Sequence, residues 1–353
     1  MNTSALLPSR IERNLASRET SGDAASPNLW VHTDKGPRRI ADLQGRPFGA
    51  YVNGAVFSST PEGFFPVGEQ ELCRLTTEEG YAVEAPASHF IQVVMPQPDP
   101  RDATQRTDWK PIGSLKPGER LVLHHHIDAF WSGDGTAEEG WLLGLEAAHG
   151  ARPALRPLAR KRLQSIAGIY AREEAGDLAV LLGEEVADPF SRLAVRFDFD
   201  DASGRVTEAM EEASSAFYEG FLRGRFDADA CVEEEEHQIV LPLDTLPSGE
   251  GTVIQRMLSR IGIEAVLTQE ALVVANQSLV TFHDRVGFDE TRKAAALERL
   301  LASYRRGPNR DSGSATVLSV APLGTAPIYD CTIPGPDAFD GNGFYLHNRT
   351  PGR

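Results

Sequence analysis

The chain has 353 residues, and its hydrophobic fraction of 41% and charged fraction of 24% are typical of a globular protein with room for two cores. The formal net charge of -16 disfavours tight nonspecific binding to nucleic acid or to an anionic membrane, because such binding depends on Lys and Arg neutralising phosphates. The three cysteines form no CxxC pair, and no apolar run approaches the roughly 20 residues that span a bilayer. We therefore expect a cytoplasmic monomer without a membrane partner.

The first third of the chain has the pattern of a β domain. Residues 1-27 are polar, lack the apolar core of a signal peptide and are predicted to be a disordered lead-in. Asn53-Gly54 between two apolar runs predicts a hairpin. Further strands are predicted over residues 29–32, 47–52, 71–76, 81–84, 90–95 and 120–123.

Helical spacing of apolar residues begins after about residue 133 and continues for much of the chain. Helices are predicted over residues 137–149, 158–171, 208–223, 251–261 and 291–305. Strand patterns return over residues 315–320, 329–333 and 344–346.

The predicted fold class is mixed. A split all-β domain, formed by residues 28-133 and 307-348, hosts an inserted α/β domain of residues 134-306, and residues 349-353 form a tail. The cost of closing a loop grows only logarithmically with its length, so the two β halves can pair if the insert folds with its ends close together.

The end of the chain carries a chemical signal in His347-Asn348, which five residues follow. An asparagine side-chain amide can attack its own backbone carbonyl, form a succinimide and cut the chain. A neighbouring histidine assists by donating a proton to the leaving group. The dipeptide alone favours an ordinary polar tail, so the rest of the chain has to decide.

Segments at both ends resemble the blocks of a known family. Residues 36–43, 52–54 and 60–65, together with residues 327–335 and 342–348, resemble the splicing (HINT) domain of inteins, and are most similar to inteins of adenosylcobalamin-dependent ribonucleotide reductases. Within the insert, residues 142–150 and 221–230 resemble the two motifs of a LAGLIDADG homing endonuclease. The resemblance implies a protein self-splicing element with an inserted DNA endonuclease domain.

This resemblance implies catalytic roles for His89, Asp330, His347 and Asn348. The block that contains His89 strains and polarises the first peptide bond in the family, and the terminal His-Asn pair performs the cyclisation. Splicing needs no cofactor. Some inteins begin with Ala and use an internal Cys beside the closing block, which is the position of Cys331; the alternative for Cys331 is a small buried strand residue.

Several family positions are altered in this chain. The expected first residue falls near Asp23 or Ala24, and neither is a Cys or Ser nucleophile. The threonine that should precede His89 by three positions is Pro86, and the family histidine in the block before Asn342 is Asp337. Arg349 follows the terminal asparagine and cannot accept an acyl group. Full splicing is therefore expected to be blocked at both ends, while asparagine cyclisation can still release the tail.

The endonuclease half is expected to be impaired as well. In the family, each motif helix ends in a carboxylate, and the pair shares divalent metal ions, normally Mg²⁺. The second motif supplies Asp229 as the catalytic and metal-binding residue, whereas the first has His149 at this position, with Glu146 one turn earlier. Mg²⁺ is the expected cofactor if the domain is active. Binding of double-stranded DNA is expected to be weak or lost, because the acidic run over residues 233–236 would repel DNA unless it is only a solvated loop.

Other interpretations stay open. The chain can be a non-catalytic intein remnant or DNA-binding module, or a wrongly bounded fragment of an intein-containing ribonucleotide reductase. His124-His125-His126 is interpreted as a strand end, because strand neighbours point to opposite faces and three in a row cannot all reach one ion. The intein interpretation requires that the outer segments meet and bring His89 beside the junction that His347 and Asn348 flank.

Overall fold

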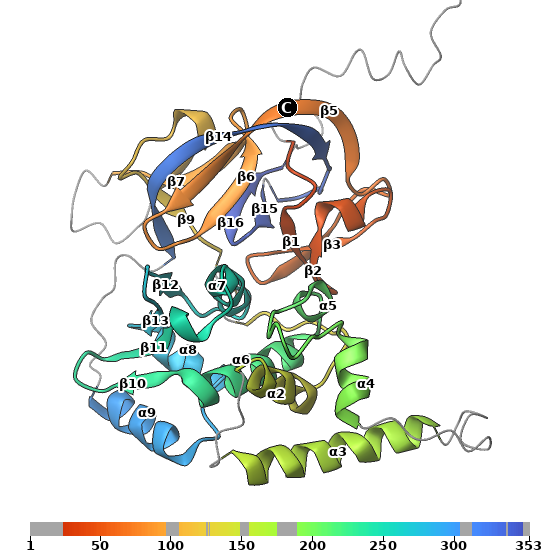
Figure 1. Cartoon of the computed structure of the whole chain (residues 1–353). Coiled ribbons are helices and arrows are strands. Elements are labelled where there is room, and N and C mark those ends of the chain that lie inside the picture. Colours follow the sequence, from red (N-terminus) through yellow and green to blue (C-terminus); the bar gives the residue numbers. More distant parts are fainter. Residues whose placement is uncertain are drawn as a thin grey trace, which may run out of the picture.

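The computed structural model describes residues 24–96, 106–124, 126, 128–148, 155–174, 189–303, 313–336 and 338–348. The two ends of the chain form a mostly β part, drawn at the top of Figure 1, and the middle forms a helical part with a small sheet below it. The chain thus has the mostly β part and the helical part that the mixed fold class requires. No described helix combines the length and the apolar character needed to cross a bilayer.

The elements of the β part are β1 (Trp30–Thr33), β2 (Gly36–Arg39), η1 (Ile40–Leu43), β3 (Gly49–Val52), β4 (Ala55–Ser58), β5 (Phe65–Thr77), β6 (Ala82–Pro86), β7 (Phe90–Val94), β8 (Thr107–Pro111), η2 (Ile112–Ser114), β9 (Arg120–Val122), β14 (Ser314–Asp330), β15 (Ala338–Gly341) and β16 (Phe344–His347). The elements of the insert are α2 (Ala137–Glu146), α3 (Arg156–Glu174), α4 (Pro189–Arg196), α5 (Glu208–Glu211), α6 (Ser215–Asp229), β10 (Cys231–Glu233), β11 (Gln238–Pro242), η4 (Leu243–Thr245), α7 (Glu250–Arg260), β12 (Ala265–Leu267), β13 (Ala271–Ala275), α8 (Ser278–Arg285) and α9 (Thr291–Ser303).

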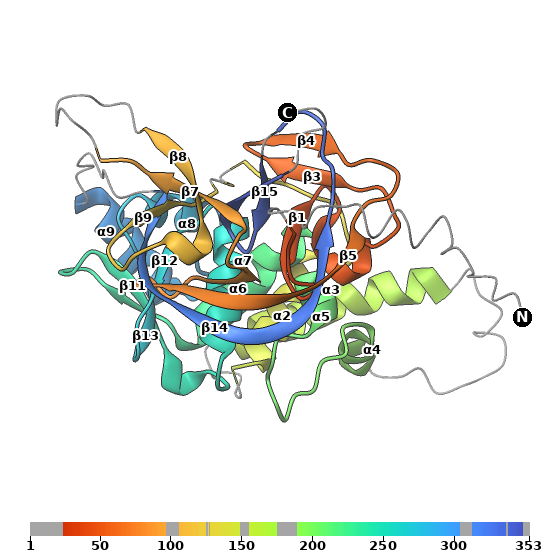
Figure 2. The same ribbon diagram turned by 90° about the horizontal axis from the view of Figure 1, so that it is seen from above.

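The two outer segments share one sheet. Its order is β4-β3-β1-β15-β16-β7-β9-β14-β5-β6, with β2 on β1 and β8 on β7, so β15 and β16 lie between two strands of the first segment. β14 also pairs with β5 over nearly the full length of both strands, and the two long, bent strands run side by side in Figure 2. The expectation that the outer segments come together in space is confirmed.

Local signals place several of these strands. Asn53 and Gly54 both have positive φ, 51° and 76°, and form the predicted hairpin between β3 and β4. The two strands predicted over residues 315–320 and 329–333 are instead one strand, β14, because its partner β5 is long enough to pair with the residues between them as well. This strand ends at Asp330.

The helix predicted over residues 208–223 is also wrong as a single element. It is two helices, because the hydroxyl of Ser214 accepts a hydrogen bond from the backbone N–H of Phe217 at 3.0 Å and so caps the start of α6. The short helix α5 ends before this cap, at Glu211.

The lead-in is ordered closer to the start of the chain than predicted. Ala24 and Ala25 are completely buried, and Ala25 exchanges two backbone hydrogen bonds with Tyr329, at 2.8 and 2.9 Å. The prediction of disorder up to residue 27 is therefore wrong for residues 24–27, because this pairing gives their backbone the partners that a disordered segment takes from water. Residues 1–23 lie outside the described part of the chain.

The insert leaves and re-enters the β part at neighbouring positions. β9, which precedes it, pairs with the start of β14, which follows it, with Val122 opposite Ser314. The buried apolar side chains of the insert and of the β part form two separate clusters. Each part therefore has its own core, and the close ends of the insert keep the cost of the split small.

Candidate active site

His89 lies in the turn between β6 and β7 and is completely buried. Its Nδ1 atom is 2.8 Å from the carbonyl oxygen of Ala24. A carbonyl oxygen only accepts hydrogen bonds, so Nδ1 carries the proton and donates it. The backbone N–H of His89 donates to Pro86, the residue at the family's threonine position, at 3.0 Å. The structure thus brings His89 to the backbone segment in which the first intein residue was predicted.

Asp330 and Cys331 lie beside the same N-terminal segment. They follow Tyr329, which pairs with Ala25, and both are 2% exposed. The carboxylate of Asp330 accepts a hydrogen bond from the backbone N–H of Cys331 at 2.8 Å. Cys331 is a buried thiol, so its position next to the opening segment agrees with both of the roles considered for it.

Asn348 is held at both ends of its amide. Its Oδ1 accepts from the backbone N–H of Ile333 at 3.2 Å, and its Nδ2 donates to the carbonyl oxygens of Ile333 at 2.7 Å and Pro336 at 3.1 Å. The side chain is 1% exposed. The nucleophilic nitrogen of the predicted cyclisation is therefore fixed in one position in the interior.

His347 lies on the other face of its strand. Leu346 and Asn348 are buried, whereas His347 is partly exposed, as strand alternation requires. Its ring meets Trp109 edge-on, with centroids 5.0 Å apart, and lies 6.1 Å from the ring of Phe90. The predicted general-acid role of His347 stays a prediction.

Strand pairing relates His89 to the end of the chain. β16 runs antiparallel to β7, with Leu346 opposite Ile91. His89 lies two positions before Ile91 and Asn348 lies two positions after Leu346, so both are at the same end of this strand pair. Both are also buried, which places two predicted site residues, from chain positions far apart, on one side of the sheet.

The insert contains two helices whose backbones touch. A Cβ atom built on Gly144 of α2 would lie 2.1 Å from the carbonyl oxygen of Phe221, and one built on Gly224 of α6 would lie 2.2 Å from that of Trp141. Gly140 and Gly220, one turn earlier on each helix, make the same kind of contact with the facing backbone. The four glycines form a reciprocal pattern, which lets the backbones of α2 and α6 approach each other closely.

This pattern fixes which residues correspond on the two helices. Since Gly144 corresponds to Gly224, the counterpart of Asp229 is His149, which lies outside the described residues. Asp229 lies at the end of α6, and its carboxylate forms an ion pair with Arg225 at 3.2 Å; both side chains are buried. The role of Asp229 as a metal ligand stays a prediction. In the acidic run after it, Glu234 forms an ion pair with Arg299 at 2.7 Å, at the surface.

Asp227, two residues before Asp229, joins three helices and was not singled out from the sequence. Its Oδ2 accepts from the indole N–H of Trp141 on α2, and its Oδ1 accepts from the backbone N–H groups of Asp289 and Glu290 before α9, each at 2.9 Å. Burial raises the pKa of Asp227. No signal in the sequence separates the role of this aspartate from that of Asp229.

A second cluster of titratable groups includes two residues of the histidine run, which follows the end of β9 as expected. His125 lies outside the described residues, but His124 and His126, two positions apart, meet His32 and Asp340 in the interior. Nε2 of His126 is 2.6 Å from Oδ2 of Asp340, and the rings of His32 and His126 are 4.6 Å apart. Three successive strand residues cannot all face one ion, but alternate residues such as His124 and His126 share a face.

Burial keeps two of these imidazoles neutral. It lowers the pKa of His32 well below its ordinary value and that of His124 to about 3. Burial by itself would raise the pKa of Asp340, but the neighbouring His124 and the hydrogen bond with His126 hold it below its usual range. The cluster therefore combines an ionised carboxylate with neutral imidazoles.

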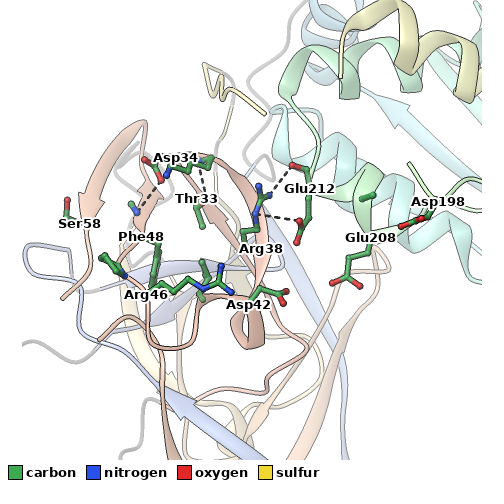
Figure 3. A pocket seen from close by; sticks show the side chains of 15 residues that line it. Thr33, Asp34, Arg38, Asp42, Arg46, Phe48, Ser58, Asp198, Glu208 and Glu212 are labelled. Carbon is green, nitrogen blue, oxygen red and sulfur yellow. Dashed lines mark hydrogen bonds and ion pairs between the residues drawn. The ribbon is translucent and has the colours of Figure 1, made fainter. Parts of the chain in front are cut away.

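A cavity of about 740 Å³ lies between η1 of the β part and α5 of the insert (Figure 3). Arg38 and Glu212 face one another across it, and the guanidinium of Arg38 donates to the backbone carbonyl of Glu212 at 3.0 Å. None of the predicted site residues lines this cavity. It is a mixed-charge gap between the two parts and is separate from the site around His89.

Comparisons with known proteins give distant relatives. No family model matches the chain. It is 25% identical over 244 residues to a DNA polymerase of Thermococcus hydrothermalis, and 27% identical over 112 residues to the DNA-directed RNA polymerase subunit Rpo1C of Methanocaldococcus jannaschii. The matched regions cover 63% and 31% of this chain, but only 14% and 13% of those proteins.

Solved structures that resemble the chain include inteins. One is a DnaB intein from Synechocystis sp. PCC 6803, with a TM-score of 0.33 and 10% identity, covering 92% of this chain and 98% of that one. Another is a variant of the Ssp DnaB mini-intein, also with a TM-score of 0.33 and 10% identity, covering 92% of each chain.

Proposed function

We propose that this chain is an intein-derived self-splicing element with an inserted LAGLIDADG-type domain, and that its remaining autocatalytic reaction is cyclisation of Asn348. The observation that carries the proposal is the meeting of the two outer segments in one sheet. In this arrangement, Nδ1 of His89 is hydrogen-bonded to the carbonyl oxygen of Ala24. The amide of Asn348 is buried at the same end of the β7–β16 pair.

The hydrogen bonds of Asn348 suit the proposed reaction. Nδ2 attacks the backbone carbonyl carbon of Asn348 and gives up one of its two protons, the bond to the nitrogen of Arg349 breaks, and the departing amine takes up a proton. Donation of both amide hydrogens to the carbonyls of Ile333 and Pro336 increases electron density on the attacking nitrogen and fixes its position. The products are a succinimide at residue 348 and a free peptide of residues 349–353.

We propose asparagine cyclisation without full splicing. Neither Ala24 nor Ala25 carries the thiol or hydroxyl that the first step requires, although the backbone of this segment is held by His89 and Tyr329. Pro86 supplies neither a hydroxyl nor a backbone N–H at the family's threonine position. The similarity of this chain to inteins of ribonucleotide reductases stays a prediction.

For the insert, we propose a retained LAGLIDADG-type architecture with impaired DNA cleavage and weak or lost binding of double-stranded DNA. The reciprocal glycine contacts between α2 and α6 support the architecture. Among the described residues, all four strands of the small sheet follow α6, so the half that begins with α2 lacks their counterpart. The pairing of Asp229 with Arg225, and a histidine at its counterpart, do not fit a two-carboxylate Mg²⁺ site.

The cyclisation is tested by fusing a reporter domain after Arg353 and following the purified fusion at 37 °C by gel electrophoresis and intact-mass spectrometry. We expect slow release of a fragment that begins at Arg349, and no release from Asn348→Ala. The matched control is Asn28→Ala, since Asn28 is exposed and outside the site. A folded fusion that stays intact for days would contradict the proposed reaction, and a ligated product would contradict the blocked splicing.

The nuclease proposal has its own test. Plasmid DNA that carries polymerase or reductase genes is incubated with the purified chain and Mg²⁺. We expect no site-specific cleavage, and a defined cut or nick that disappears in Asp229→Asn would overturn the proposed impairment.

A further inference from the structure

The buried cluster of His32, His124, His126 and Asp340 has the composition of a metal site. His32 lies on β1, Asp340 lies on β15, and the other two histidines lie in the segment that leads from β9 into the insert. One ligand atom from each of His32, His126 and Asp340 lies within 4.8 Å of the others. All three residues are at most 3% exposed.

Several polar atoms in this cluster lack the partners that buried groups normally have. Neither ring nitrogen of His32 has a hydrogen-bond partner, and neither does Nδ1 of His126. Buried polar atoms in folded proteins are nearly always hydrogen-bonded, so an unpaired buried imidazole requires an explanation. The neighbours of His32 offer none, because the ring is surrounded by Tyr51 and Trp131 as well as by the ring of His126.

We infer that His32, His126 and Asp340 bind one divalent transition-metal ion, with Zn²⁺ the best match to the donor set. Two imidazole nitrogens and a carboxylate oxygen are common ligands of Zn²⁺, which takes four ligands in a tetrahedron. The ion would replace the proton that Nε2 of His126 and Oδ2 of Asp340 now share. The fourth ligand is water or His124, whose ring lies parallel to that of His126 with centroids 5.2 Å apart.

The charges around the cluster permit a cation. Arg260 is a nearby positive group, and its guanidinium donates to the carboxylate of Glu211 at 2.9 Å, which it shares with Arg256, and to the hydroxyl of Tyr218 at 2.8 Å, so its charge is partly offset by Glu211. A second group of acids, Asp42, Glu208 and Glu212, also has metal-like spacing, but its members are partly or fully exposed. Exposed carboxylates are satisfied by water, so this second group carries no inference.

The inferred ion would fasten three segments of the fold. His32 belongs to the opening strand, His126 to the entry of the insert, and Asp340 to the β15–β16 hairpin that ends next to Asn348. The ion would therefore hold the closing hairpin in the sheet without contacting Asn348. The inference is independent of whether asparagine cyclisation occurs.

The test uses the full chain, stripped with EDTA and then titrated with Zn²⁺. We expect about one bound equivalent by elemental analysis after dialysis, and a Tm raised by about 5 °C or more over the EDTA-treated protein, as for any ligand that binds only the folded state. His32→Gln and Asp340→Asn should each lose the equivalent and the shift. Titration of the unmodified chain with Co²⁺ should give the visible absorption bands of a tetrahedral site, which keeps the test informative if a variant does not fold.

Two control variants exclude other locations. His283→Gln removes an exposed histidine, and Glu208→Gln removes a member of the exposed acidic group; both should keep the full equivalent of Zn²⁺. The inference is overturned if the unmodified chain binds no Zn²⁺, if its Tm is the same in Zn²⁺ and EDTA, or if Glu208→Gln abolishes binding while Asp340→Asn does not.

Discussion

Nδ1 of His89 donates a hydrogen bond to the carbonyl oxygen of Ala24 across 2.8 Å, and both residues are completely buried. The bond joins the start of the described chain to the turn between β6 and β7. Tyr329 holds the next residue, Ala25, from the other half of the β part. The opening segment is thus fixed by one partner from each half, although no helix or strand among the described residues begins before Trp30.

Replacement of His89 should therefore weaken the fold as well as any chemistry at this segment. We expect His89→Ala to lower the free energy of unfolding by about 1–3 kcal/mol, because it leaves the buried Ala24 carbonyl without its donor. Urea unfolding followed by circular dichroism measures the change. The control is Ser88→Ala, at an exposed neighbouring position, which should shift stability by less than about 0.5 kcal/mol. Equal effects of the two substitutions would contradict a specific role for this hydrogen bond.

The contact between α2 and α6 should not tolerate a methyl group. Gly224→Ala would place Cβ 2.2 Å from the carbonyl oxygen of Trp141, which is backbone and cannot rotate away. We expect a loss of about 1–3 kcal/mol or more in the free energy of unfolding, despite the gain of about 1 kcal/mol that Ala brings over Gly within a helix.

The matched control for that prediction is Gly251→Ala on α7. Its Cβ would meet the ends of the flexible side chains of Leu243 and Leu267 at 2.8 Å, which can move aside. We expect its thermal midpoint to stay close to that of the unmodified chain. A Gly224→Ala protein as stable as Gly251→Ala would show that the two backbones are not in contact.

Local sequence signals were enough to predict much of the β part. The Asn53-Gly54 pair predicted a hairpin because the tight turn between two such strands favours residues with positive φ. Alternation of apolar and polar residues indicated most other strands. The order of the motifs predicted that the end of the chain would meet its beginning. The burial of Ala24 was not predictable, because its partners are a ring and a strand from distant positions.

The buried histidine cluster could also be predicted only in part from the sequence. The spacing of His124 and His126 already placed both on one face of a strand, so part of the signal was in the sequence. His32 and Asp340 are isolated residues within apolar strands, and only the sheet order β1-β15 makes them neighbours. Asp227 and Asp229 likewise differ in the partners that packing gives them, and not in local pattern.

Asp227 should be more important for stability than Asp229. Asp227→Asn replaces an acceptor of three hydrogen bonds with a group that has one acceptor oxygen and an NH₂ that faces donors. We expect a loss of about 1–3 kcal/mol in the free energy of unfolding. Asp229→Asn, which keeps an oxygen for Arg225 at the end of α6, should cost less, and the two urea midpoints compare them directly. A larger loss for Asp229→Asn would show that the three hydrogen bonds accepted by Asp227 contribute little to stability.

Glu211 connects the pH dependence of stability to the contact between the two parts. It accepts hydrogen bonds from Arg256 and Arg260 of α7 at 2.7–2.9 Å, and both guanidinium groups lie over the ring of Trp30 on β1. Burial alone would raise the pKa of Glu211, but the two arginines outweigh it and lower the pKa from its ordinary value of 4.5. The ionised carboxylate is thus the form that the folded chain favours.

The sign of the pH effect follows from this direction. Above pH 4.5 the stabilisation from Glu211 is fully present, and it is lost as the pH falls through the lowered pKa of the folded state, because the unfolded chain binds the proton first. Glu211→Gln leaves the buried guanidinium of Arg260 and the partly buried one of Arg256 without their carboxylate and should cost about 3–5 kcal/mol at pH 7. Urea unfolding from pH 7 to pH 3 should show this difference shrink below pH 4.5. Glu235→Gln, at an exposed position, should follow the unmodified chain throughout. A constant gap between the Glu211→Gln variant and the unmodified chain would mean that Glu211 titrates alike in the folded and the unfolded state.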